Sequence, residues 1–166
     1  VALLPFIGQQ ELHQKFHLDE PWDSDHNRKL IPLMPDIFTI GLVEASAPAV
    51  SKGKTRVVLP LIEGSLWQGD DGRLPRIKDV TDGTANTIGL LIAPPGADVI
   101  WTKPEDFPMN KAHEMFGERD FCLLTTLDGG LWRVANSTAE EVLSALLTFD
   151  VGDTVDRKRI IRKNVD

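Results

Sequence analysis

The chain has 166 residues, of which 42% are hydrophobic and 26% are charged, values typical of one soluble globular domain. Its formal net charge of −7 argues against a nucleic-acid partner, because the phosphate backbone is itself negative. The single cysteine, Cys122, excludes an internal disulfide, and its apolar neighbours predict that it is buried.

Two short helices are predicted in the first part of the chain. Apolar residues recur at spacings of five and four across residues 8–16, which favours a short amphipathic helix. A second helix is predicted to begin at Ser24 or Asp25, because either side chain can cap the exposed backbone amides. Pro35 should end it.

The middle of the chain predicts strands. Residues 44–54 are small, polar and rich in turn formers, which indicates a surface loop. The β-branched run 55–62 predicts a strand, although Pro60 confines part of it to a sheet edge. Two further strands are expected over 87–93 and 98–102.

A β-hairpin is the clearest local signal in the sequence. Strands are predicted over 120–127 and 131–135, and Asp128-Gly129-Gly130 lies between them. Glycines supply the positive backbone angles that such tight connections need.

A helix is predicted after the hairpin. Ser137 with Glu140, and Thr138 with Glu141, have the spacing of a capping box. The apolar residues that follow share one helical face, and Gly152 is a suitable terminator. They are Val142, Leu143, Leu146 and Leu147.

These elements predict an α+β fold, with an antiparallel β-sheet and short peripheral helices, because regular strand-helix-strand alternation is absent from the sequence. One domain is expected over 1–155, followed by a basic tail over 156–166. The tail is interpreted as a solvated end, with contact to an anionic surface as the alternative.

Histidines and carboxylates provide two candidate metal sites. His13 and His17 are four residues apart, the spacing with which zinc proteases bind one metal from a helix. The adjacent general-base Glu of those enzymes is replaced by Gln14, so two surface histidines are the alternative. Asp79 and Asp82 offer hard oxygen ligands for calcium, but residues of these types also form ordinary turns.

The four tryptophans are candidates for ligand or partner binding. Each lies next to a turn-like segment, which suits either a core anchor or a stacking platform for a sugar. They are Trp22, Trp67, Trp101 and Trp132. The segment 64–69 contains a serine but lacks the glycine spacing of a nucleophile elbow, so no serine triad is predicted.

Three segments in this order resemble the family called domain of unknown function 1559. They are Phe16-His17-Leu18-Asp19-Glu20-Pro21-Trp22-Asp23-Ser24, then the run 79–88, then Trp101-Thr102-Lys103-Pro104-Glu105-Asp106. The resemblance spans nearly the whole chain. Where many relatives show a Cys-Pro-Ser segment, this chain has Asp36-Ile37-Phe38-Thr39-Ile40.

The resemblance implies an architecture and not a reaction. The family is abundant in planctomycetes, has no established catalytic activity, and commonly carries a prepilin leader and a long hydrophobic helix before such a domain. We therefore expect a fold similar to a pilin head and a parent protein at the cell envelope. Membrane contact would occur only through a missing N-terminal segment.

The expected function is that of a non-catalytic structural or binding domain of a pilin-like cell-envelope protein. No catalytic residue and no required cofactor are predicted, and protein partners or self-assembly are expected in the full-length parent. The alternative is a ligand-binding module for a glycan or calcium, whose sign would be a concave site where tryptophans and carboxylates converge. A hydrolase is the third interpretation, and it would need a nucleophile and a base close together.

Overall fold

The computed structural model describes residues 1–43, 52–68, 75–152, 155, 158 and 160, and the chain divides into two compact units. Unit 1 is Val1–Arg56 with Asp98–Glu105, and unit 2 is Val57–Ala97 with Asp106–Asp166. The single domain predicted over 1–155 stays a prediction. Most of the predicted loop 44–54 and of the basic tail 156–166 lies outside the described residues.

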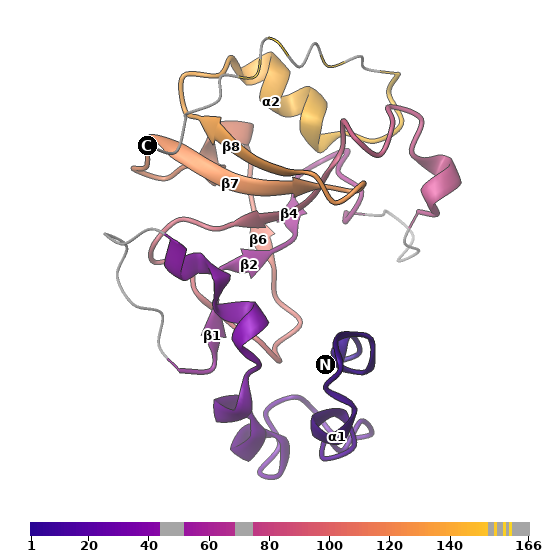
Figure 1. The fold of residues 1–166 in the computed structure, drawn as a ribbon, viewed down its shortest axis with the longest axis vertical. Helices are drawn as coiled ribbons and strands as arrows, with labels where there is room; N and C mark the ends of the chain where they lie inside the picture. The colour runs from indigo at the N-terminus through magenta and orange to yellow at the C-terminus, as the bar shows by residue number, and fades with distance from the viewer. Residues whose placement is uncertain (44–51, 69–74, 153–154, 156–157, 159, 161–166) are drawn as a thin grey trace. The chain divides into compact units, whose positions relative to one another are not determined.

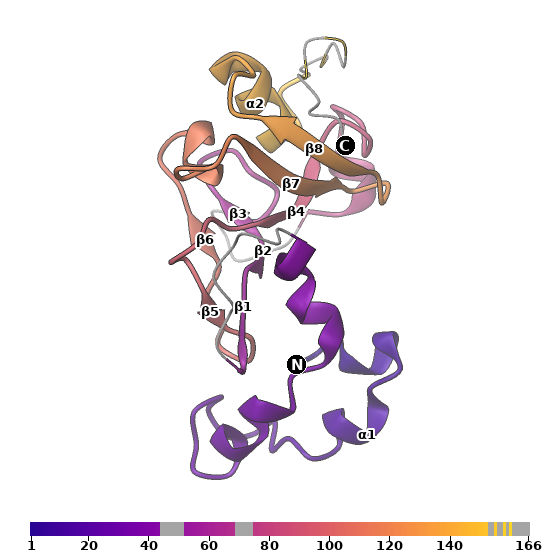
Figure 2. The same ribbon diagram turned by 60° about the vertical axis from the view of Figure 1, so that its left-hand side comes forward.

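Unit 1 consists of short helical segments and one two-stranded ribbon (Figure 2). Its helical elements are the 3₁₀ helices η1 (Leu4–Ile7), η2 (Asn27–Leu33) and η3 (Asp36–Val43) and the α-helix α1 (Gln10–His13). The strands β1 (Lys54–Thr55) and β5 (Val99–Ile100) pair antiparallel. Within the described part of the chain, no helix is both long enough and apolar enough to cross a membrane.

The first helix is shorter than predicted over 8–16. It ends at His13, because the backbone amides after Gln14 bond three residues back instead of four. Lys15 N–H donates to the Leu12 carbonyl, and Phe16 N–H donates to the His13 carbonyl, both at 3.1 Å. His17 therefore lies outside the helix, and the prediction that it shares a helical face with His13 is wrong.

The second predicted helix forms as the 3₁₀ helix η2. It begins at Asn27, two to three residues later than predicted from Ser24 or Asp25, and ends before Pro35 as expected. Pro32 lies inside it. Since proline has no backbone N–H and its ring clashes with the preceding turn, this position disfavours a regular α-helix.

Trp101 belongs to the buried core cluster of unit 1, with Leu4, Leu12 and Phe16. Its ring packs edge-on against Phe16, with centroids 5.8 Å apart, and is stacked on Phe38 at 5.6 Å. Its indole Nε1–H donates to the Ile31 carbonyl at 2.8 Å. Of the two alternatives for this tryptophan, the structure supports the core anchor.

Unit 2 is built on a four-stranded antiparallel sheet (Figure 1). In sheet order its strands are β2 (Val57–Val58), β4 (Ile88–Ile92), β7 (Phe121–Thr126) and β8 (Leu131–Ala135). The antiparallel pairing and the few short helices confirm the predicted α+β class in outline. The strand predicted over 55–62 is instead split among β1, β2 and β3 (Pro60–Leu61), because each short piece pairs with a different partner.

One face of the sheet forms part of the core of unit 2. Alternate residues of β7 are buried, among them Cys122 and Leu124. Val134 lies opposite Cys122, and Leu91 lies opposite Leu124, and both are buried. The helix α2 (Glu140–Leu147) lies beside β7 and β8 in both ribbon views, with its four predicted apolar residues buried (Figures 1 and 2).

The predicted hairpin joins β7 to β8. Asp128 Oδ1 accepts hydrogen bonds from the Thr126 hydroxyl at 2.6 Å and from the Gly130 amide at 3.0 Å. Gly129 has a φ of 87°, which a residue with a Cβ adopts only at a cost. The hairpin prediction is confirmed.

A second strand pair in unit 2 is parallel. β3 pairs with β6 (Phe107–Pro108), so that Leu61 lies opposite Pro108. The Asp106 carboxylate supports the pair by accepting a hydrogen bond from the Leu59 amide at 3.0 Å. Unit 2 also contains the 3₁₀ helices η4 (Ile77–Asp79) and η5 (Ala112–Met115).

Gly53→Ala should destabilise the protein more than Gly8→Ala. Both glycines have positive φ, 83° and 74°, so both changes carry backbone strain. A Cβ on Gly53 would lie 2.5 Å from Ile31 Cγ2 and 3.1 Å from the Ile31 carbonyl oxygen, whereas a Cβ on Gly8 meets nothing within 4 Å. The expected difference is about 1 to 3 kcal/mol in free energy of unfolding, measured by denaturant titration. Equal losses for the two variants would show that Ile31 does not crowd this position.

Candidate functional site

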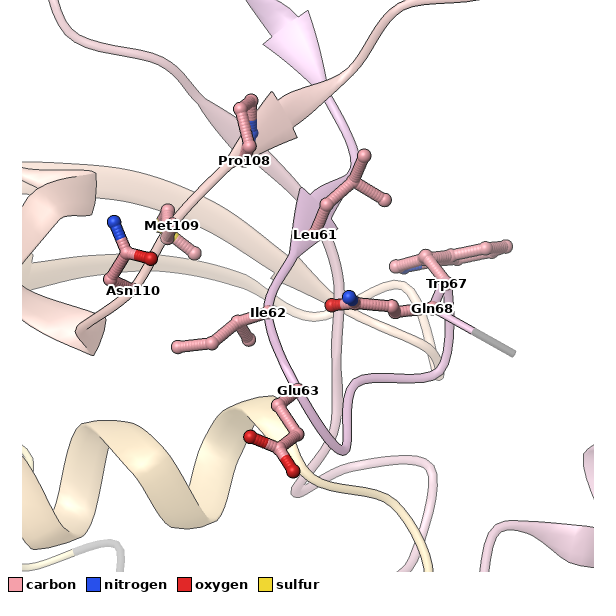
Figure 3. Close-up of a pocket in the computed structure, with 8 residues that line it drawn as sticks. All are labelled: Leu61, Ile62, Glu63, Trp67, Gln68, Pro108, Met109 and Asn110. Carbon is pink, nitrogen blue, oxygen red and sulfur yellow. The ribbon is translucent and has the colours of Figure 1, made fainter. Parts of the chain in front are cut away.

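A pocket of about 620 Å³ lies in unit 2 where β3 and β6 end (Figure 3). Eight residues line it, in two chain segments: Leu61, Ile62, Glu63, Trp67 and Gln68 in the first, and Pro108, Met109 and Asn110 in the second. The volume is within the range of sites that bind small molecules. The parallel pairing of the two strands brings these distant segments together.

Ser65 holds the loop that forms one wall of the pocket. It is 2% exposed, and its hydroxyl donates to the Pro60 carbonyl at 3.1 Å. Its backbone carbonyl accepts from the Gln68 amide at 3.2 Å, and Ser65 forms an isolated β-bridge with Thr148 after α2. The hydroxyl therefore has a structural role.

The pocket combines one aromatic ring with polar groups of three kinds of residue. Trp67 is half-buried, while Glu63, Gln68 and Asn110 are exposed. Figure 3 shows the Gln68 amide beside the edge of the Trp67 ring and the Asn110 amide on the opposite side of Ile62. Glu63 is the only charged residue among the eight.

The indole N–H of Trp67 is buried and has no acceptor within hydrogen-bond distance in the part of the chain that the structure describes. An unsatisfied buried donor costs free energy. Packing of the ring must therefore hold Trp67 in place.

The sequence identified only one of the polar or aromatic residues of the pocket. Trp67 was a candidate by residue type, but Glu63, Gln68 and Asn110 were not predicted. Among the other candidate tryptophans, Trp22 is half-buried in unit 1. Trp132 lies on β8, opposite the buried Leu124.

The candidate histidine pair does not share a helix in the structure. His13 ends α1, whereas His17 lies beyond it and stacks on His26, with ring centroids 3.6 Å apart and planes 2° apart. His17 Nδ1 is 2.8 Å from Glu20 Oε1. Within the described residues, no group of three or more His, Cys, Asp or Glu side chains is arranged to hold a metal ion.

Asn27 organises the segment that contains His17, although no sequence pattern indicated it. It is 2% exposed, and its side-chain amide donates to the carbonyls of His17 and Pro21 at 2.9 and 3.0 Å. Its Oδ1 accepts from the His17 amide at 3.0 Å. This buried side chain shapes the first of the three family-like segments.

Both candidate calcium ligands accept hydrogen bonds from backbone amides. Asp79 Oδ2 accepts from the Arg76 amide at 2.9 Å, at the start of η4. Asp82 is buried, and its Oδ1 accepts from the Gly152 amide at 2.7 Å. The neighbouring run Asp70-Asp71-Gly72 lies outside the described residues. A calcium site stays a prediction.

An ion pair between His113 and Glu140 connects η5 to the start of α2. The carboxylate of Glu140 bonds to His113 Nδ1 and also accepts from the Ala112 amide at 2.8 Å. The other ring nitrogen, His113 Nε2, is 3.0 Å from the Asn136 carbonyl. The predicted capping box of Ser137 with Glu140 is therefore not formed: Ala139 is the N-cap, and Glu140 is the first residue of the helix.

The two groups stabilise each other's charged forms. The hydrogen bond to Glu140 raises the pKa of His113 above its ordinary value of 6.5. Desolvation is the largest single influence on Glu140 and raises its pKa. The hydrogen bonds from His113 and Ala112 and the charge of His113 together outweigh it, so the pKa of Glu140 lies below 4.5. No sequence pattern indicated this pair, because 27 positions separate its members.

Comparison of the chain with protein-family models, with curated proteins and with solved structures finds no match. The resemblance to the domain of unknown function 1559 therefore stays a prediction.

Glu140→Gln should lower the free energy of unfolding by up to about 1 kcal/mol, because both side chains of the pair are more than a third exposed. A raised pKa in His113 gives stabilisation that is complete below pH 6.5 and is lost as the pH rises through the folded-state pKa. A lowered pKa in Glu140 gives stabilisation that is complete above pH 4.5 and is lost as the pH falls through the folded-state pKa.

The difference between wild type and Glu140→Gln should therefore be largest between pH 4.5 and 6.5. Denaturant titrations across this range check it, with Glu141→Gln, the same change at the next helix position, as the control. If the difference in free energy of unfolding does not shrink at alkaline pH, the stabilising ion pair between His113 and Glu140 is contradicted.

Proposed function

We propose that this chain is a non-catalytic binding domain and that a carbohydrate binds in the pocket beside Trp67. The observation that carries the proposal is the meeting of an indole ring, two amides and one carboxylate around a cavity of about 620 Å³. A concave site where tryptophans and carboxylates converge is the sign expected of a glycan-binding module, and a pocket with one residue of each kind supports that interpretation.

The chemistry of the lining favours a sugar. A pyranose ring has an apolar C–H face that packs on an indole, and hydroxyls around its edge that hydrogen-bond to polar groups. The amides of Gln68 and Asn110 donate and accept, and the Glu63 carboxylate accepts. Because Glu63 is the only charged residue among the eight described lining residues, an anionic ligand would be repelled and would find no counter-charge among these side chains.

Three observations support a binding role over hydrolysis. Among the described residues that line the pocket, Glu63 is the only carboxylate, whereas glycoside hydrolysis uses a pair. The Ser65 hydroxyl donates to a backbone carbonyl and is buried. Both ring nitrogens of His113 already have hydrogen-bond partners. A hydrolase would need a nucleophile and a base within hydrogen-bond reach of the substrate.

Trp67→Phe should weaken binding of N,N′-diacetylchitobiose or cellobiose about three- to tenfold, because a smaller ring loses stacking area. Gln68→Ala should weaken it by a similar factor through a lost hydrogen bond. Calorimetric titration measures both, and Trp22→Phe, the same change in unit 1, is the matched control. Unchanged affinity in Trp67→Phe, or equal loss in Trp22→Phe, would place the sugar elsewhere. The absence of heat with both sugars would contradict the proposed carbohydrate site.

A second proposed function is that of a structural domain, similar to a pilin head, in a cell-envelope protein that binds protein partners or further copies of itself. The resemblance to the domain of unknown function 1559 supports it. So do large apolar side chains on the surface of unit 1, since Phe6 is 85% exposed and Leu3 is 63% exposed.

Phe6→Ser should abolish weak self-association at high protein concentration and change the free energy of unfolding by less than about 0.5 kcal/mol, because the side chain is exposed. Sedimentation velocity over a concentration series measures association, and denaturant titration measures stability. The assembly proposal fails if wild type and variant are equally monomeric. A large loss of stability would instead show that Phe6 packs within its own chain.

A further inference from the structure

One wall of the pocket is directly continuous with η5. Pro108, Met109 and Asn110 line the pocket, and η5 begins at Ala112, two residues after Asn110. The Asn110 backbone amide donates to Glu114 Oε2 at 3.2 Å, so the wall is also bonded to a side chain of η5. A shift of η5 would therefore move Asn110.

Glu140 fixes η5 through three donors. The Ala112 amide donates to Oε1 at 2.8 Å, the His113 amide donates to Oε2 at 3.3 Å, and His113 Nδ1 bonds to Oε2. On the other side of the imidazole, Nε2 is 3.0 Å from the Asn136 carbonyl. The imidazole thus connects η5 both to the first residue of α2 and to the residue that follows β8.

This arrangement requires a doubly protonated imidazole. A carboxylate and a carbonyl only accept hydrogen bonds, so both ring nitrogens of His113 must donate. Loss of either proton would leave two acceptors facing each other. Within the described residues, Glu140 is the one charged group that bonds to the imidazole. The Phe116 ring packs beside it, with ring centroids 5.6 Å apart. The Glu114 carboxylate bonds to the Asn110 amide instead.

We propose that the ion pair between His113 and Glu140 positions the Asn110 wall of the pocket, so that carbohydrate affinity falls when His113 loses its proton. This inference rests on the proposed binding function and adds its regulation. His113 and Glu140 are positioning residues, because neither lines the pocket. His113 is also the only histidine in unit 2, so its titration can be separated from that of the other three histidines.

The first arm of the test measures affinity against pH. Calorimetric titration with N,N′-diacetylchitobiose from about pH 5 to about pH 9 should give affinities two- to fivefold higher at the acid end, about the strength of one exposed ion pair. His113→Gln and Glu140→Gln should give flat profiles near the lower value. His13→Gln and Glu141→Gln should keep the wild-type profile. A flat wild-type profile with measurable binding would overturn the inference and leave the binding function standing.

The second arm needs no ligand. In NMR spectra of the free protein, the Asn110 side-chain amide should shift with the same pH midpoint as the His113 ring, and the shift should disappear in Glu140→Gln. If the Asn110 side-chain amide signal does not shift as His113 titrates, the inference is overturned. If Asn110 follows His113 but no sugar binds, the positioning of the wall is supported and the carbohydrate assignment fails.

Discussion

The parallel pairing of β3 with β6 is the constraint on which the pocket depends. Each strand has two residues, so few backbone hydrogen bonds hold the pair: Phe107 N–H donates to the Leu59 carbonyl at 3.1 Å, and Met109 N–H donates to the Leu61 carbonyl at 2.8 Å. The Asp106 carboxylate adds a bond to the Leu59 amide. Because isolated short strand pairs are marginal in water, the surrounding side chains must supply the remaining stability.

Two residues provide that support from outside the strands. The Ser65 hydroxyl ties the loop after β3 to the Pro60 carbonyl, and the Ser65 backbone pairs with Thr148, the residue after α2. Glu140 ties the segment after β6 to the beginning of α2 through η5. Both walls of the pocket are thus connected to one helix, and only the second connection contains a group that titrates near neutral pH. In the proposed regulation, a proton on His113 would therefore act on Asn110 and not on Trp67.

Local patterns predicted the features that depend on neighbours in sequence. The hairpin followed from Asp128-Gly129-Gly130, and burial of Cys122 followed from its apolar strand. Prediction failed where contacts between residues distant in sequence determine the structure. Glu140 was assigned to a helix cap, but it bonds to His113, 27 positions away. The pocket could not be foreseen beyond Trp67, because it requires β3 to pair with a strand 47 positions further along the chain.

The most direct test of the account is the position of a bound sugar relative to Trp67. In an NMR sample of the protein with cellobiose, nuclear Overhauser effects should connect the sugar C–H protons to the Trp67 indole protons and to the Asn110 side-chain amide. Contacts confined to Trp22 or Trp132, or no contacts to any indole at saturating sugar, would contradict the carbohydrate site.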